Sequence, residues 1–127
     1  MRKSPSIQEP LVERRRTQRA RVATPIQFRN VLRPEEPFKG SLSRDLSGGG
    51  VSVSAHAFVP KEARLVLLLS LPDSLKPIRV IGRVAWMRQR RFSEGYDLGI
   101  QFIEALSQDQ ERIADCAERA LAALPSF

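Results

Sequence analysis

The hexapeptide Asp45-Leu46-Ser47-Gly48-Gly49-Gly50 separates two segments of alternating hydrophobicity and leads directly into Val51-Ser52-Val53-Ser54. Its carboxylate, its hydroxyl and its three glycines form a small polar cradle that lets a backbone approach a ligand closely. Asp, Ser and Gly are also ordinary turn formers, so the hexapeptide alone is more typical of a tight connection between strands that binds nothing. The segments around it therefore decide how it is interpreted.

Alternation of apolar and polar residues predicts six short strands around this hexapeptide. The predicted strands are 24–32, 38–44, 51–54, 63–71, 78–88 and 97–102. The fourth is apolar on both faces, so both must be covered. Trp86 falls on the apolar face of the fifth, a position more typical of a core residue than of a ligand platform. Because closure removes exposed edges, the pattern favours a mainly β fold, a small antiparallel barrel over about 22–103.

The last segment of the chain has a helical period. Ser107 and Gln110 form a capping-box pattern, and apolar residues from Ile113 to Leu124 make one stripe that stops at Pro125. We therefore expect a helix over about 107–124 that lies across the barrel and covers an apolar face. Cys116 is expected to pack there as a small hydrophobic residue.

Positive charge is concentrated at the start of the chain. The 21 Lys and Arg residues exceed the 14 Asp and Glu residues, and the net charge is +7. Residues 1–21 hold seven basic and two acidic residues, a local charge of +5. Residues 1–13 include two prolines and little apolar material, which predicts a flexible tail. A basic arm on a nearly neutral body predicts a phosphate-rich partner: a nucleotide, a nucleic acid or a lipid surface.

Several functional classes are disfavoured by composition. Cys116 is the single cysteine, so neither an internal disulfide nor a cysteine-based zinc site is expected. The longest apolar stretch, around 65–69, is too short to cross a bilayer, and a soluble protein of the reducing cytoplasm is expected. His56 has no nucleophile to serve and Asp45 has no second carboxylate at a catalytic spacing, so we expect neither an enzyme nor a metal site.

Two short motifs, in order and in strand context, resemble those of a PilZ domain. The first is Arg15-x-x-x-Arg19 before the first strand, and the second is Asp45-x-Ser47-x-x-Gly50 after the second strand. The segments Gly82-Arg83-Val84-Ala85-Trp86 and Gly95-Tyr96-Asp97-Leu98-Gly99-Ile100-Gln101-Phe102 add to the likeness. The resemblance covers residues 13–124, and we place the domain at 14–124.

The resemblance implies a six-stranded barrel that acts as a bacterial receptor for the second messenger cyclic di-GMP. Guanine offers acceptors at O6 and N7, which suit an arginine, and donors at N1 and N2, which suit a carboxylate or hydroxyl. It further implies that Arg15 and Arg19 bind the Hoogsteen edge of guanine and the phosphates. Asp45 and Ser47 would accept the N1 and N2 hydrogens, and Gly50 would keep the turn open.

The same resemblance extends to stoichiometry and output. An arginine at the place of Arg14 goes with a stacked pair of nucleotides in this family, so two ligands per chain are expected. Arg14 and Arg16 would lie between guanine faces and phosphates, and Trp86 on the fifth strand would lie beside the ligand. The arm is expected to become ordered on binding, and an unidentified downstream protein would detect the change.

Two other functions stay open. A nucleic-acid-binding small barrel would explain the charge, although such barrels expose several aromatic residues for base stacking and few are expected here. A PilZ adaptor that acts through protein contacts alone would lack the arginines of the first motif, which this chain retains.

Overall fold

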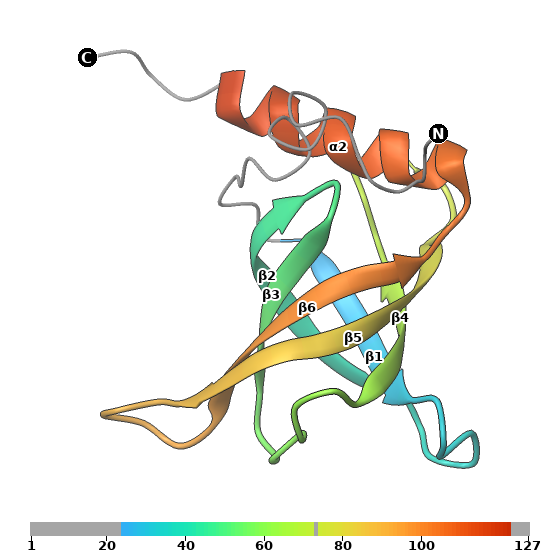
Figure 1. Ribbon diagram of the computed structural model, residues 1–127. Coiled ribbons are helices and arrows are strands. Elements are labelled where there is room, and N and C mark those ends of the chain that lie inside the picture. Colours follow the sequence, from blue (N-terminus) through green and yellow to red (C-terminus); the bar gives the residue numbers. More distant parts are fainter. Residues whose placement is uncertain (1–23, 73, 123–127) are drawn as a thin grey trace, which may run out of the picture.

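The computed structural model describes residues 24–72 and 74–122, and in it six strands close into a barrel (Figure 1). The elements are β1 (Pro25–Asn30), β2 (Lys39–Ser47), β3 (Gly50–Ala55), β4 (Arg64–Leu69), β5 (Ile78–Gln89), β6 (Tyr96–Glu104) and the helix α2 (Ser107–Ala122). Around the barrel the order is β1-β2-β3-β6-β5-β4, and each neighbouring pair is antiparallel. The predicted antiparallel six-stranded barrel with a C-terminal helix is confirmed. The basic arm lies outside the described residues.

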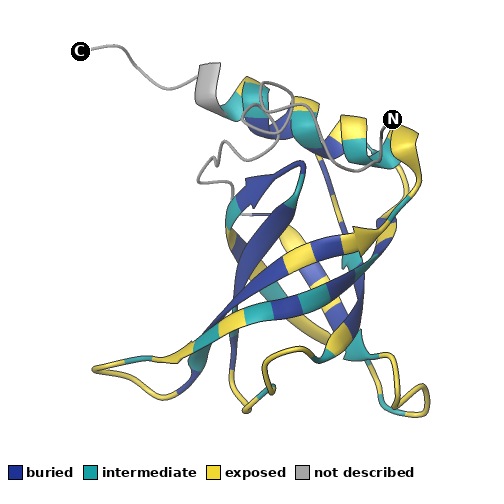
Figure 2. Cartoon of the chain, in the orientation of Figure 1, coloured by how far each residue is buried: buried dark blue, intermediate teal, exposed yellow. Residues whose placement is uncertain are grey.

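Alternation along the strands fills the barrel interior. On β1, Ile26 and Phe28 are buried whereas Gln27 between them is exposed (Figure 2). Each of the six strands contributes a side chain that is almost fully buried: Ile26, Leu46, Val51, Leu67, Val80 and Leu98. Burying one such side chain stabilises the fold by roughly 1.5–3 kcal/mol, so this interior is the main source of stability.

The most apolar strand, β4, is covered on both sides as the sequence predicts. Leu65, Leu67 and Leu69 point into the core, while Val66 on the opposite face is also buried and Leu68 is half-buried.

The boundary predicted for β2 is wrong. The sequence placed the strand end at Arg44, but the strand continues to Ser47 and the turn contains only Gly48 and Gly49. A shift of register between Ser43 and Asp45 interrupts the simple alternation. Asp45 therefore lies within the strand.

The expectation that Trp86 belongs to the core is also wrong. A second register shift, between Val84 and Trp86, inserts an extra residue into β5 and turns the indole outward, where it is 40% exposed. Met87 packs against the core in its place.

The helix α2 lies across one end of the barrel (Figure 1). Its first turn is closed by the Leu106 carbonyl, which accepts hydrogen bonds from the backbone N–H groups of Asp109 and Gln110. Ile113, Cys116 and Ala117 are buried on the face predicted to cover the barrel. The end of the predicted stripe at Leu124 lies outside the described residues. Within the described part of the chain, no helix is long and apolar enough to span a membrane.

Candidate ligand-binding site

A row of four residues crosses the outer face of four adjacent strands. Asp45 on β2 pairs with Ser52 on β3, Ser52 pairs with Gly99 on β6, and Gly99 pairs with Trp86 on β5. We call Asp45, Ser52, Gly99 and Trp86 the polar row. With strands about 4.8 Å apart, the row spans about 14 Å on the barrel wall.

The carboxylate end of the polar row keeps accepting capacity. Among the described residues, half-buried Asp45 accepts one side-chain hydrogen bond, from Ser52 Oγ at 3.1 Å. An ionised carboxylate has about four acceptor positions, so one donor does not saturate it. The next residue, Leu46, is fully buried in the core and fixes the backbone from which Asp45 projects.

The other two residues of the second predicted motif shape the turn. The Ser47 hydroxyl accepts the Gly49 N–H at 3.2 Å and donates to the Gly50 carbonyl at 3.4 Å. Ser47 is buried, so in this structure its polar contacts stabilise the bend. A Cβ on Gly50 would lie 2.5 Å from the carbonyl oxygen of Ile100, which means that β3 and β6 approach too closely there for a side chain.

The aromatic end of the polar row rests on a glycine. The Trp86 indole lies where a Gly99 side chain would be, because a Cβ on Gly99 would overlap the indole nitrogen and ring carbons. The Arg88 guanidinium lies 5.8 Å from the centre of the Trp86 ring, within the range of a cation–π contact. Trp86 therefore presents a partly exposed aromatic surface at the opposite end of the row from Asp45.

The arginines of the first motif, Arg14, Arg15, Arg16 and Arg19, lie outside the described residues. The point where their segment joins the barrel is described, however. The Thr24 N–H donates to Ser43 Oγ at 2.9 Å, and the Ser43 N–H donates to the Thr24 carbonyl at 2.9 Å. Ser43 lies two residues before Asp45 on β2, so the arm begins beside the strand that carries the carboxylate. Arg19 is five residues from Thr24, which limits their Cα separation to about 18 Å.

An arginine cluster that the sequence analysis missed lies next to the polar row. Asp97 on β6 accepts contacts from Arg44 Nη1 at 2.8 Å, Arg90 Nε at 3.2 Å and Arg88 Nη2 at 3.4 Å. One carboxylate thus orients three guanidiniums on the same face as Trp86. Alternation places Asp97 and Gly99 on one face of β6, but Arg44 lies beside the register shift in β2, so its position could not be read from the pattern.

Burial alone would raise the pKa of Asp97, since its side chain is only 7% exposed. Hydrogen bonds from Arg44 and Arg90, the charge of Arg44 and the hydrogen bond from Arg88 outweigh burial and lower the pKa below 3.8. A carboxyl with a lowered folded-state pKa stabilises the fold above its unfolded pKa, and this contribution is lost as the pH falls through the folded value.

We expect Asp97→Asn to lower the free energy of unfolding at pH 7 by about 2 kcal/mol, because it leaves three arginines without their counter-charge. The difference from the unchanged protein should shrink as the pH falls from about 3.8 through the lowered folded-state pKa of Asp97, because the unchanged protein lacks the carboxylate charge only below that folded-state value. Urea unfolding at pH 7 and in acid measures both effects. Asp109→Asn, which breaks an i,i+3 pair with Arg112 on α2, is the control and should cost less than about 1 kcal/mol. A difference independent of pH would contradict this account of Asp97.

Within the described residues, no group of three or more His, Cys, Asp or Glu side chains could hold a metal ion. His56 is exposed in the connection between β3 and β4.

These features define a small β-barrel domain whose candidate site lies on the outer wall of the barrel. The PilZ domain family model matches residues 13–119, and the chain belongs to this family. No curated protein sequence matches the chain.

Three solved bacterial structures share the fold. The inhibitor of motility MotI/DgrA of Bacillus subtilis has a TM-score of 0.71 and 20% identity, over 84% of this chain and 51% of MotI. The PilZ domain of YcgR from Escherichia coli, solved with c-di-GMP, has a TM-score of 0.62 and 11% identity over 82% of this chain and 91% of that domain. The MrkH–c-di-GMP complex of K. pneumonia has a TM-score of 0.59 and 20% identity over 83% of this chain and 49% of MrkH. The chain therefore spans about half the length of MotI and of MrkH.

Proposed function

We propose that this chain is a bacterial receptor for cyclic di-GMP that binds the nucleotide between its basic arm and the polar row. The observation that carries the proposal is that Asp45 and Trp86 lie in one cross-strand row, on the face beside which the arm joins the barrel. Family membership supports the assignment, as do the YcgR domain and MrkH, which were solved with this nucleotide.

The chemistry of the site matches the ligand. Asp45 has accepting positions for guanine N1 and N2 hydrogens, whereas Arg15 and Arg19 supply donors for O6, N7 and the phosphates. Trp86 supplies an aromatic surface along which a guanine could stack, and base–aromatic stacking contributes roughly 1–3 kcal/mol per base. Each bidentate arginine contact to guanine adds roughly 1–3 kcal/mol, and a micromolar dissociation constant requires about 8 kcal/mol. Two arginines, Asp45 and stacking suffice for that affinity.

In this proposal two nucleotides bind as a stacked pair, with Arg14 and Arg16 between guanine faces and phosphates. The chain acts as a receptor and not as an enzyme. Its output is the ordering of the arm over the barrel, which creates a surface for a downstream protein. Part of the binding free energy is spent on ordering the arm, so a moderate affinity is expected.

Calorimetric titration with cyclic di-GMP tests the proposal. Separate titrations with cyclic di-AMP, GTP and single-stranded RNA test the alternative ligands. Selective binding with a stoichiometry near two is expected. Trp86 is the single tryptophan, so its fluorescence reports independently whether the ligand reaches the polar row. Equal binding of all four ligands, or binding of cyclic di-GMP without any change in Trp86 fluorescence, would count against the receptor site described here.

Asp45→Asn should weaken cyclic di-GMP binding about tenfold to a hundredfold, because the amide replaces an acceptor oxygen with a donor facing the guanine hydrogens. Asp45 is half-buried and bonds Ser52 alone among the described side chains, so the fold should survive the substitution. Titration of the variant beside Glu35→Gln, an exposed position in the β1–β2 loop, measures the effect. An unchanged affinity of Asp45→Asn for cyclic di-GMP would show that Asp45 does not belong to the binding site.

A further inference from the structure

We propose that Arg44 and Arg88 form a phosphate-binding site on the barrel wall, which takes a phosphate of the nucleotide whose base stacks on Trp86. The inference rests on the proposed function and extends its site to residues that belong to neither sequence motif. In this arrangement the basic arm supplies one set of arginines and the wall of the barrel supplies another.

The arginine cluster around Asp97 lies at the right place for a phosphate. Arg88 on β5 pairs with Asp97 on β6, two residues beyond the pair of Trp86 and Gly99 in the polar row. Side chains two residues apart on a strand share a face and lie about 7 Å from each other. The Arg88 guanidinium is 5.8 Å from the centre of the Trp86 ring. Because one sugar separates the base of a nucleotide from its phosphate, a base on Trp86 brings its phosphate to Arg88.

Positive charge exceeds negative charge in this cluster. The three guanidiniums of Arg44, Arg88 and Arg90 share the single carboxylate of Asp97, so three charges minus one leave +2. The carboxylate is 7% exposed and holds the guanidiniums in place, but it neutralises only one of them. A fixed group of guanidiniums with surplus charge is suited to an anion such as phosphate.

Arg44 and Arg88 can contact one phosphate together. Arg44 Nη1 and Arg88 Nη2 approach the same oxygen of Asp97, Oδ2, at 2.8 Å and 3.4 Å, so these nitrogens are at most 6.2 Å apart, the sum of the two distances. Contacts of about 2.8 Å from one phosphate span a gap of this size. The two side chains are 54% and 70% exposed, and each guanidinium has five N–H donors, so donors remain for a ligand.

The cluster borders an open hollow with room for part of a nucleotide. The hollow has a volume of about 750 Å³, within the range of roughly 300–1,000 Å³ typical of small-molecule sites. Four arginines and one aspartate line it, a net charge of +3: Arg44, Arg88, Arg90, Arg91 and Asp97. The surroundings of the cluster therefore add to its attraction for an anion.

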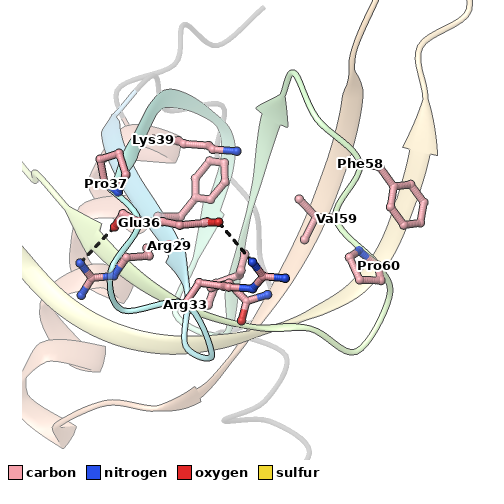
Figure 3. Close-up of a pocket in the computed structure, with 11 residues that line it drawn as sticks. Arg29, Arg33, Glu36, Pro37, Lys39, Phe58, Val59 and Pro60 are labelled. Carbon is pink, nitrogen blue, oxygen red and sulfur yellow. Dashed lines mark hydrogen bonds and ion pairs between the residues drawn. The ribbon is translucent and has the colours of Figure 1, made fainter.

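A second basic hollow lacks this convergence. The β1–β2 loop and the β3–β4 connection line a hollow of about 230 Å³ (Figure 3). Its two guanidiniums lie on opposite sides of Glu36: Arg29 Nη1 donates to the Glu36 carbonyl at 3.5 Å, and Arg33 Nη1 contacts the Glu36 carboxylate at 3.7 Å. The guanidiniums diverge, and one carboxylate matches the charge of Arg33. We therefore place the phosphate site at Asp97.

Calorimetric titration of the full chain with cyclic di-GMP tests the phosphate site. Arg44→Gln with Arg88→Gln should weaken binding roughly thirtyfold, at about fivefold to sixfold per arginine, because solvent-exposed charged contacts are weaker than buried ones. Arg33→Gln with Arg79→Gln is the control, since it removes two exposed arginines outside the cluster and changes the net charge equally. Its affinity should stay within about twofold of that of the unchanged protein at physiological salt, which screens distant charges.

The stability of the variants is controlled separately. Loss of both Arg44 and Arg88 leaves Asp97 with Arg90 as its remaining arginine in the cluster, which lowers stability. Each titration is therefore run below the unfolding temperature of that variant. Arg88→Gln alone is also titrated, because Asp97 then keeps Arg44 and Arg90, and this variant should bind about fivefold more weakly.

Inorganic phosphate distinguishes an anion site from a structural role of the same arginines. Exchange of chloride for phosphate at constant ionic strength should weaken cyclic di-GMP binding by the unchanged protein and by the control variant. The Arg44→Gln, Arg88→Gln variant should respond less, because it lacks the wall site for which phosphate competes. If the cluster served only to hold β5 and β6 together, all three proteins would respond equally to phosphate.

The possible failures are distinguishable. If the unchanged protein does not bind cyclic di-GMP, the proposed function is wrong and this inference is wrong with it. If the unchanged protein binds but the Arg44→Gln, Arg88→Gln variant has the same affinity, the same loss as the control or the same response to phosphate, the phosphate site alone is wrong.

Discussion

Replacing either Arg15 or Arg19 by alanine is expected to weaken cyclic di-GMP binding by roughly a hundredfold or more. Each guanidinium would make a paired contact with a guanine edge or a phosphate, worth roughly 1–3 kcal/mol, and loss of one also leaves the arm less firmly docked. The anchoring of Thr24 to Ser43 on β2 makes this geometry possible, because it starts the arm beside the carboxylate end of the polar row.

Calorimetry on Arg15→Ala and Arg19→Ala measures the loss, and Arg79→Ala is the control. Arg79 is an exposed arginine at the start of β5, outside the polar row, so its removal changes net charge without touching the proposed site. A loss of equal size in all three variants would show that the arginines act only through net charge. Raising the salt concentration also separates specific guanine contacts from binding through net charge alone. Nonspecific polyanion binding falls steeply with salt, whereas guanine contacts persist.

The barrel could be predicted from sequence because its strands alternate strictly where they are regular. Ile26 and Phe28 on β1 and Leu98 and Ile100 on β6 are buried as the period of two requires. The helical stripe on α2 likewise places Ile113 against the barrel. In these elements the local pattern and the tertiary packing agree.

The two errors have one physical cause. At Ser43/Asp45 and at Val84/Trp86 the paired strands shift register, and a shift of one residue exchanges the faces of everything that follows. Pairing partners far apart in sequence determine where such a shift falls, so neither β2 nor β5 reveals it alone. The shift in β5 carries Trp86 outward and is therefore what completes the polar row.

The candidate site was predictable in part for the same reason. Asp45, Ser47 and Gly50 could be found because they stand close together in a recognisable motif. Ser52 and Gly99 were missed as site residues, because they join Asp45 only through the register between β2, β3 and β6. The cluster around Asp97 depends on the same register, and no local signal marks it.

The close approach of β3 and β6 at Gly50 leads to the largest expected effect on stability. Gly50→Ala would place a methyl group 2.5 Å from the backbone oxygen of Ile100, and a backbone oxygen cannot move aside without shifting β6. We expect a loss of about 2–4 kcal/mol in the free energy of unfolding, which lowers the unfolding temperature by on the order of 10 °C or more.

Gly40→Ala is the matched control, because a Cβ on Gly40 meets nothing within 4 Å. Alanine there should be neutral or stabilise the barrel by up to about 1 kcal/mol, since it reduces the freedom of the unfolded chain. Thermal unfolding of both variants tests the comparison, and cyclic di-GMP titration below the transition shows whether the turn beside Asp45 still binds. If the Gly50→Ala variant is as stable as the Gly40→Ala variant, β3 and β6 have room for a side chain at Gly50. The conformation of the Ser47–Gly50 turn would then need another explanation, because the turn would no longer be set by the contact between these two strands.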